Sequence, residues 1–178
     1  MKSAALAALV VTLLACATPI VAQSNAQSPP QDRERFISIT QKLQEAPLDP
    51  MLRDDRQWAL QWLVEAPDVS VNACLATLGG SSLTKYSHSD EIIAQYTLAM
   101  AALIIQHPEA ANDPQAEQLA GAEGALNAYR AMLRADPKAK SAELDKLLEM
   151  QGRGGLPGFV RGSLSRCYTG KGEEVRLR

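Results

Sequence analysis

Apolar residues recur at helical spacing along most of the chain. Phe36, Ile39 and Leu43 lie three or four positions apart, which places them on one face of a helix. Other segments between residues 32 and 167 repeat this spacing, and proline, glycine or aspartate interrupts it at intervals. No segment alternates apolar and polar residues for long enough to predict a strand. The pattern predicts an all-α fold, a compact bundle of six or seven short-to-medium helices with short loops.

The helix breakers predict where each helix begins and ends. The segment 90–106 is apolar nearly all the way round, which predicts a buried central helix. Gly121 and Gly124 lie inside the longest predicted helix, where each costs about 1 kcal/mol relative to alanine. Glycine at these two positions therefore indicates close packing or a bend of the helix. A polar connector is expected over 81–89. The expected helices cover about 32–45, 50–64, 70–78, 90–106, 114–135, 141–150 and 159–167.

The first 22 residues have the features of a secretory signal peptide. Lys2 supplies a positive charge, residues 4–17 are apolar and uncharged, and Ile20-Val21-Ala22 fits a signal peptidase site. The apolar run is too short for a membrane-spanning helix, which needs about 20 residues. We therefore expect an exported protein, periplasmic or secreted, that is cleaved after Ala22.

A second processing site is an alternative. Leu13-Leu14-Ala15-Cys16 fits the pattern of apolar and small residues before a cysteine at which bacterial lipoproteins are cut and acylated. Acylation at Cys16 would anchor the protein to a membrane. We favour cleavage after Ala22, because that site fits at least as well.

The mature chain is expected to form one domain between two less ordered segments. Residues 23–31 are polar and contain proline, which is typical of a disordered lead. Residues 32–167 carry the helical pattern and are expected to form a single helical domain. Residues 168–178 are expected to be a flexible C-terminal tail.

Two cysteines remain after cleavage, Cys74 and Cys167. In an oxidising compartment an even pair favours a disulfide, although two separate buried thiols are the alternative. A bridge would close a loop of about 90 residues, which the chain-entropy argument values at about 4 to 5 kcal/mol. It would also hold the C-terminal helix against the middle of the fold.

Composition excludes some classes of partner. The chain has 18 Lys and Arg against 20 Asp and Glu, so it lacks the basic surplus of a nucleic-acid-binding protein. Aromatic residues make up 4%, which disfavours a sugar or peptide groove built on stacking. Beyond the first residues no segment is long and uncharged enough to span a membrane.

The sequence contains no motif for catalysis, nucleotide binding or metal binding. His88 and His107 are isolated and lack the spacing of zinc ligands, so no cofactor is expected. Ser87, His88 and Asp90 are too close along the chain to converge as a catalytic triad. An acid/base pair of carboxylates is conceivable, but the spacing selects none of the candidates. These candidates are Asp54, Asp55, Glu65, Asp68, Asp90 and Glu91.

Trp58 and Trp62 are the candidate interaction residues. They lie four positions apart and therefore share one face of a helix. Such a pair can form a surface for a ligand or partner, although large aromatic side chains beside apolar neighbours more often belong to a core.

Three classes of function stay open. We favour a non-enzymatic helical protein of the bacterial envelope that acts by binding, with another envelope protein as its partner. The first alternative is an inhibitor or immunity-type protein that blocks another exported protein. The second is an enzyme whose acidic residues come together only in the folded chain.

Overall fold

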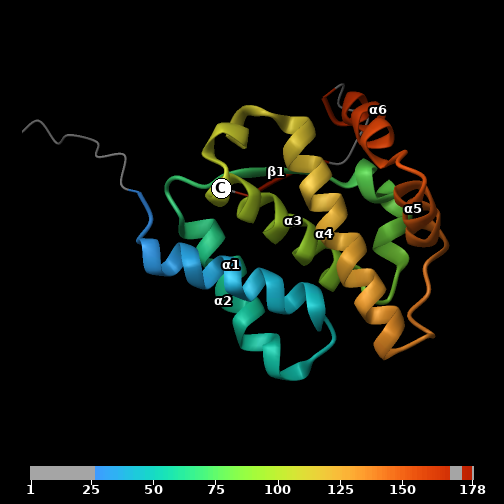
Figure 1. Cartoon of the computed structure of the whole chain (residues 1–178), viewed down its shortest axis with the longest axis horizontal. Helices are drawn as coiled ribbons and strands as arrows, with labels where there is room; N and C mark the ends of the chain where they lie inside the picture. Colours follow the sequence, from blue (N-terminus) through green and yellow to red (C-terminus); the bar gives the residue numbers. More distant parts are fainter. Residues whose placement is uncertain (1–26, 169–173, 178) are drawn as a thin grey trace, which may run out of the picture.

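The computed structural model describes residues 27–168 and 174–177 (Figure 1). The all-α prediction is confirmed, since the described chain is mostly helical. The predicted signal peptide, the alternative site at Cys16 and residues 23–26 of the lead lie outside the described residues. The α-helices are α1 (Pro30–Glu45), α2 (Arg53–Glu65), α3 (Ser89–Gln106), α4 (Pro114–Ala135), α5 (Ala142–Gly152) and α6 (Leu156–Tyr168). Short 3-10 helices are η1 (Pro50–Leu52), η2 (Leu75–Leu78), η3 (Gly80–Lys85) and η4 (Pro108–Asn112), and the strands are β1 (Val71–Cys74) and β2 (Glu174–Leu177).

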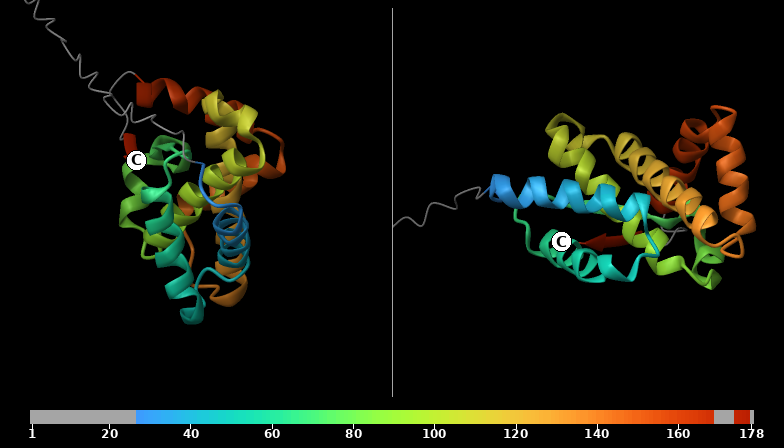
Figure 2. Two further views of the ribbon diagram at one scale, coloured as in Figure 1. Left: turned by 90° about the vertical axis from the view of Figure 1, so that its left-hand side faces the viewer. Right: turned by 60° about the horizontal axis from the view of Figure 1, so that its bottom comes forward.

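Helix α3 lies in the middle of the molecule, as its apolar sequence predicts. Figure 1 shows α1 and α2 at one end and α5 and α6 at the other, with α3 and α4 between them. Both views of Figure 2 show α1 and α2 side by side. Most α3 side chains are buried, including Tyr96, Leu98 and Met100.

Helices α3 and α4 pack closely because α4 carries glycine where they meet. A Cβ atom at Gly121 would lie 2.7 Å from the Tyr96 ring, and one at Gly124 would lie 2.4 Å from the Ala99 Cβ. Neither distance is possible between real atoms, so both positions require glycine at this separation. The sequence-based expectation of close packing at these glycines is confirmed, and it explains why their cost in helix propensity is tolerated.

The predicted helix over 70–78 is wrong. Val71–Cys74 is a strand, and only Leu75–Leu78 is helical, as a 3-10 turn. The segment is only a few residues long, and a helix of this length is marginal unless its surroundings stabilise it. Its backbone groups instead bond to side chains and to β2, both of which are distant in the sequence. The predicted polar connector after it also contains a 3-10 helix, η3.

The ends of the domain differ from the predicted boundaries. Helix α6 extends to Tyr168, and β2 pairs antiparallel with β1, with Val71 opposite Leu177 and Cys74 opposite Glu174. Four residues of the predicted flexible tail are therefore paired. Helix α1 begins at Pro30, inside the predicted disordered lead. Sequence patterns did not indicate the strand pairing, because its partner lies about 100 residues away and β2 is short and charged.

The last residues of the predicted lead are attached to the loop after α2. Ser28 is buried, and its hydroxyl donates a 2.5 Å hydrogen bond to Asp68. Arg33 of α1 pairs with the same carboxylate. Burial alone would raise the pKa of Asp68, but the hydrogen bonds from Ser28 and Arg33 and the charge of Arg33 hold it below its usual value. Asp68 therefore holds Ser28 and Arg33 against the loop after α2. This candidate catalytic carboxylate thus has a structural role.

The contact at Gly124 can be tested with a compensating pair of substitutions. Gly124→Ala should lower the free energy of unfolding by about 1 to 3 kcal/mol, because the new methyl group overpacks the interface with Ala99. Adding Ala99→Gly removes the opposing methyl group and should restore part of the loss. Urea unfolding of the single and double variants measures both effects.

Gly162→Ala in α6 is the matched control. A Cβ atom at Gly162 meets nothing within 4 Å, so this substitution should be neutral or should stabilise the protein by up to about 1 kcal/mol. Equal effects at Gly124 and Gly162, or no rescue by Ala99→Gly, would contradict the close packing of α3 on α4.

Candidate functional site

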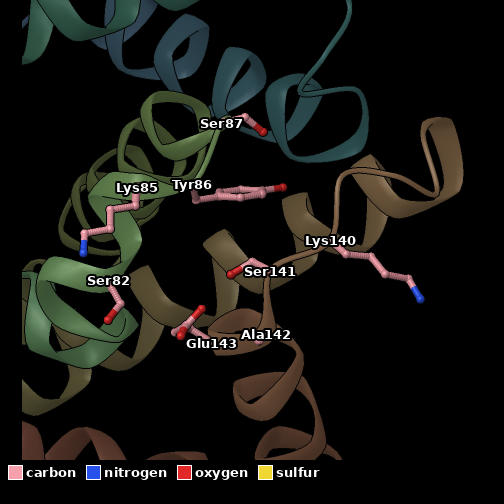
Figure 3. A pocket seen from close by; sticks show the side chains of 8 residues that line it. All are labelled: Ser82, Lys85, Tyr86, Ser87, Lys140, Ser141, Ala142 and Glu143. Carbon is pink, nitrogen blue, oxygen red and sulfur yellow. The ribbon is translucent and has the colours of Figure 1, made fainter.

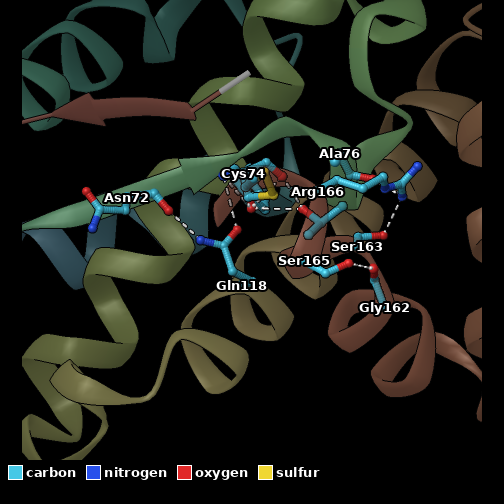
Figure 4. The surroundings of a disulfide bond; sticks show 11 residues. Asn72, Cys74, Ala76, Gln118, Gly162, Ser163, Ser165 and Arg166 are labelled. Carbon is cyan, nitrogen blue, oxygen red and sulfur yellow. Dashed lines mark hydrogen bonds between the residues drawn. A yellow bond between two sulfur atoms is a disulfide. The ribbon is translucent and has the colours of Figure 1, made fainter. Parts of the chain in front are cut away.

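The predicted disulfide between Cys74 and Cys167 is present, with Cα atoms 6.0 Å apart. It joins β1 to α6 in a small apolar cluster with Ala76 and Leu164 (Figure 4). Both cysteines are almost fully buried. Beside the bridge, Arg166 of α6 donates to the carbonyl oxygen of Ala76 at 3.4 Å. A bridge of this kind is consistent with an oxidising, extracytoplasmic compartment.

Buried polar side chains hold β1 on the side away from β2. The Gln118 amide of α4 donates to the carbonyl oxygen of Asn72 and accepts from the backbone N–H of Cys74 at 3.2 Å (Figure 4). These are the two kinds of bond that a neighbouring strand would provide. The Tyr96 hydroxyl of α3 lies 3.2 Å from the carbonyl oxygen of Cys74 and 2.9 Å from the Thr77 hydroxyl. The polar groups around the disulfide are thus bonded to one another and have a structural role.

The two histidines lie at opposite ends of α3. His88 and His107 flank the two ends of this 18-residue helix, which is about 27 Å long at 1.5 Å per residue. His88 lies 3.8 Å from Glu91, and His107 lies 3.3 Å from Glu109. Across residues 27–168 and 174–177, His, Cys, Asp and Glu form no group of three or more that could hold a metal ion.

The other candidate carboxylates stay dispersed. Asp54, Asp55 and Glu65 lie on α2, whereas Asp90 and Glu91 lie in the first turn of α3. Acidic residues at a helix N-terminus complement its dipole, which gives four of these five a structural explanation. Within the part of the chain that the structure describes, none of the helices has both the length and the apolar character that crossing a membrane requires.

A large hollow lies between η3 and the start of α5 (Figure 3). It has a volume of about 610 Å³, and Ser82, Lys85, Tyr86, Lys140 and Glu143 are among its lining residues. Figure 3 shows Lys85 and Lys140 pointing away from one another, so the two ammonium groups do not converge on a common point. The hollow is polar but has no arranged set of reactive groups.

Two tyrosines beside this hollow hold the loop between α4 and α5. The Tyr86 hydroxyl donates to the carbonyl oxygen of Ala139 at 2.9 Å. The Tyr129 hydroxyl donates to Asp145 and accepts from the backbone N–H of Ser141, each at 2.8 Å. Burial raises the pKa of both tyrosines to about 12, and nearby carboxylates add to the effect. Both hydroxyls therefore stay protonated at neutral pH and serve as hydrogen-bonding groups.

Glu117 is a buried acid that the sequence analysis did not single out. It lies in the first turn of α4, and its exposed fraction is 7%. Burial raises its pKa to about 7, and the negative charge of Asp113 contributes. Asp113 already caps α4 by accepting from the N–H groups of Gln115 and Ala116. The sequence signal was its position four residues before Gly121, on the face of α4 that packs against α3.

The tryptophans bind α2 to α1. The Trp62 ring lies 4.8 Å from Phe36 of α1 and stacks on Trp58 at 6.2 Å. The Arg35 guanidinium covers the Trp58 ring at 3.8 Å. Trp58 and Trp62 are only partly exposed and pack against the core. Part of each tryptophan is thus covered by contacts within the chain, and an interaction surface at these residues stays a prediction.

The opposite side of α2 faces outward. Leu60 and Val64 lie two positions after the tryptophans, and two positions turn the helix by about 200°. Leu60 is half-buried against the core, whereas Val64 is exposed. A shallow hollow of about 490 Å³ lies on this outward face. We define the α2 outward face by the residues that line the hollow: Arg53, Arg56, Gln57, Leu60, Gln61 and Val64.

One of the exposed apolar side chains lies on this face, and another lies in the turn that leads into α2. Met51 in η1 is 84% exposed and Val64 is 52% exposed. In the described part of the chain these two are the only large apolar side chains that are exposed. Sequence patterns could not separate Val64 from core residues, because its neighbours on α2 are also apolar.

Comparison with known proteins adds no assignment. The chain matches no protein-family model, and neither curated proteins nor solved structures show significant similarity to it.

The raised pKa of Glu117 predicts a pH-dependent stability. The folded chain binds the proton of Glu117 more tightly than the unfolded chain does, whose pKa is near 4.5. The free energy of unfolding should therefore fall as the pH rises from about 4.5 through about 7, and level off above that range. Glu117→Gln cannot ionise, so it should remove this slope and stabilise the protein at about pH 8 by roughly 1 to 3 kcal/mol.

Urea unfolding at about pH 5 and pH 8 measures the difference. Glu123→Gln on the exposed side of α4 is the matched control and should keep the pH dependence of the parent protein. If the free energy of unfolding of Glu117→Gln depends on pH as that of the parent protein does, the raised pKa of Glu117 is wrong.

Proposed function

We propose that the protein acts in an oxidising, extracytoplasmic compartment by binding another protein through the α2 outward face. The observation that carries this proposal is the position of Met51 and Val64. Both side chains are exposed although burial of each would be favourable, by about 1.5 to 3 kcal/mol for a complete side chain. Both belong to the η1–α2 segment: Val64 lines the hollow on α2, and Met51 lies in the 3-10 turn that leads into the helix. Exposed apolar side chains beside polar residues are candidate contacts for a partner.

The way α2 is held supports the proposal. Trp58 and Trp62 fix the inner side of the helix against α1. The outward face is therefore presented on a helix that is already folded, which lowers the entropic cost of binding. The disulfide supports the compartment, and the sequence at 1–22 supports export with cleavage after Ala22 or, as the alternative, acylation at Cys16.

The binding role can be tested by site-specific photo-crosslinking in the native cell. The full chain carries a photo-reactive amino acid in place of the exposed Gln57, at the centre of the α2 outward face. Irradiation should give one discrete protein adduct. The double substitution Met51→Ser and Val64→Ser should reduce the adduct about tenfold or more, because partner binding loses apolar contacts of about 1 kcal/mol each.

Two controls make the outcome specific. The same photo-reactive residue at the exposed Lys138, in the loop after α4, should not give this adduct. Thermal unfolding should show that the double serine variant folds normally, since both replaced side chains are exposed. The proposal fails if Gln57 gives no adduct, or if the adduct persists unchanged in the serine variant.

A further inference from the structure

The charges on the α2 outward face indicate what kind of partner it binds. Two of its six lining residues, Arg53 and Arg56, are cationic, and none is acidic. The chain as a whole has a net charge of −2, so the two arginines are a local feature of this face. Arg56 also donates to the carbonyl oxygen of Pro47, and Glu65 at the far end of α2 accepts from the Gln61 amide. A partner that places carboxylates beside its apolar side chains would complement this face.

The position of Arg53 strengthens this argument. Arg53 is the first residue of α2, where the helix dipole disfavours a cation. Asp54 and Asp55 in the same turn have the sign that this end favours. Within the described chain no ion pair of Arg53 is found, and its side chain is exposed. A cation that opposes the dipole and is exposed contributes little to folding, which suggests that it serves binding.

The shape of the face suits a helix. Its residues follow the helical spacing from Arg53 to Val64 and cover about three turns, or roughly 16 Å along the axis. Side chains at this spacing form ridges with a shallow groove between them, into which a second helix packs. Since α2 offers no open strand edge, an extended segment could not form main-chain hydrogen bonds with it.

We infer that the partner docks an amphipathic helix onto the α2 outward face, with acidic residues flanking its apolar stripe. This inference rests on the proposed function and specifies the binding element. The apolar stripe covers Leu60 and Val64, and the acidic residues meet Arg53 and Arg56. This arrangement is the helix-in-groove mode of recognition.

A second copy of the chain is a less favourable partner for the α2 outward face. In a two-fold dimer the same surface meets itself, and neither copy of this face offers a carboxylate to Arg53 or Arg56 of the other. The contact would leave these cations without acidic partners, which disfavours it. A membrane is also a poor fit, because Gln57 and Gln61 lie on the face, which is hollowed and carries only two cations.

The test uses designed peptides whose only systematic difference is charge. The first is an 18-residue fluorescent helical peptide with leucine at i, i+3, i+4 and i+7 and glutamate beside this stripe. The second has lysine in place of every glutamate, and the third has the composition of the first in scrambled order. Fluorescence anisotropy against the full exported chain should show that the acidic peptide binds at least about tenfold more tightly than the other two.

Arg53→Glu is the decisive variant. It should weaken binding of the acidic peptide about tenfold or more and strengthen binding of the lysine peptide, with no loss of thermal stability, because glutamate suits the helix N-terminus. Arg53→Lys should retain most of the affinity, whereas Lys138→Glu, a charge reversal away from α2, should have no effect.

Several results would overturn the inference. They are equal binding of all three peptides, no binding of the acidic peptide, an unchanged affinity in Arg53→Glu, or binding to anionic phospholipid vesicles in place of the peptide. Crosslinking at Gln57 distinguishes failure of the proposed function from failure of this inference. An adduct at Gln57 without binding of the acidic peptide leaves the proposed function intact and refutes the acidic helix, whereas the absence of an adduct refutes both.

Discussion

The contact between Gly121 of α4 and the Tyr96 ring of α3 determines where several distant parts of the chain lie. Because glycine leaves room for the ring, the Tyr96 hydroxyl reaches the backbone of Cys74. From α4, the Gln118 amide reaches the same strand. Together the two side chains satisfy the inner edge of β1, while β2 pairs with its other edge. The position of Cys74 in turn sets where Cys167 and α6 can lie, because the two cysteines are bonded.

The same arrangement leaves α2 at the periphery. Helices α3 and α4 form the centre of the core, and α2 packs on its edge through the buried Ala59 and Leu63, with the tryptophans against α1. Val64 and Arg53 on its other side stay exposed. The proposed interaction surface is thus on the helix that carries Trp58 and Trp62, on the side away from them.

The sequence predicted the elements whose stability is local. The apolar run of α3, the Asp-Pro start of α4 and the serine cap of α5 are visible within a few residues, and each of these helices forms close to its predicted limits. The glycines at 121 and 124 indicated close packing for the same reason. The disulfide was predicted from the even number of cysteines and from the expected oxidising compartment. Neither depends on the geometry of the fold.

The features that were missed depend on contacts between distant residues. The strand at 71–74 exists because Gln118, Tyr96 and β2 supply its hydrogen bonds, and none of these is near it in sequence. The spacing of Glu117 from Gly121 indicated the packed face of α4, but the depth of burial that raises its pKa depends on how α4 packs. Likewise, the pattern placed Trp58 and Trp62 on one face of α2, but only packing decides which face is turned toward α1.

Amide hydrogen exchange of the protein would test the packing of α3 on α4 best, because it reports the stability of each element within one molecule. If the contact between Tyr96 and Gly121 is central, the amides of α3 and α4, with that of Cys74, exchange most slowly and only through global unfolding. Those of α2 should exchange faster through local opening at the edge of the fold. Exchange of α3 and α4 that is as fast as that of α2, or faster, would contradict the central role of the contact between Tyr96 and Gly121.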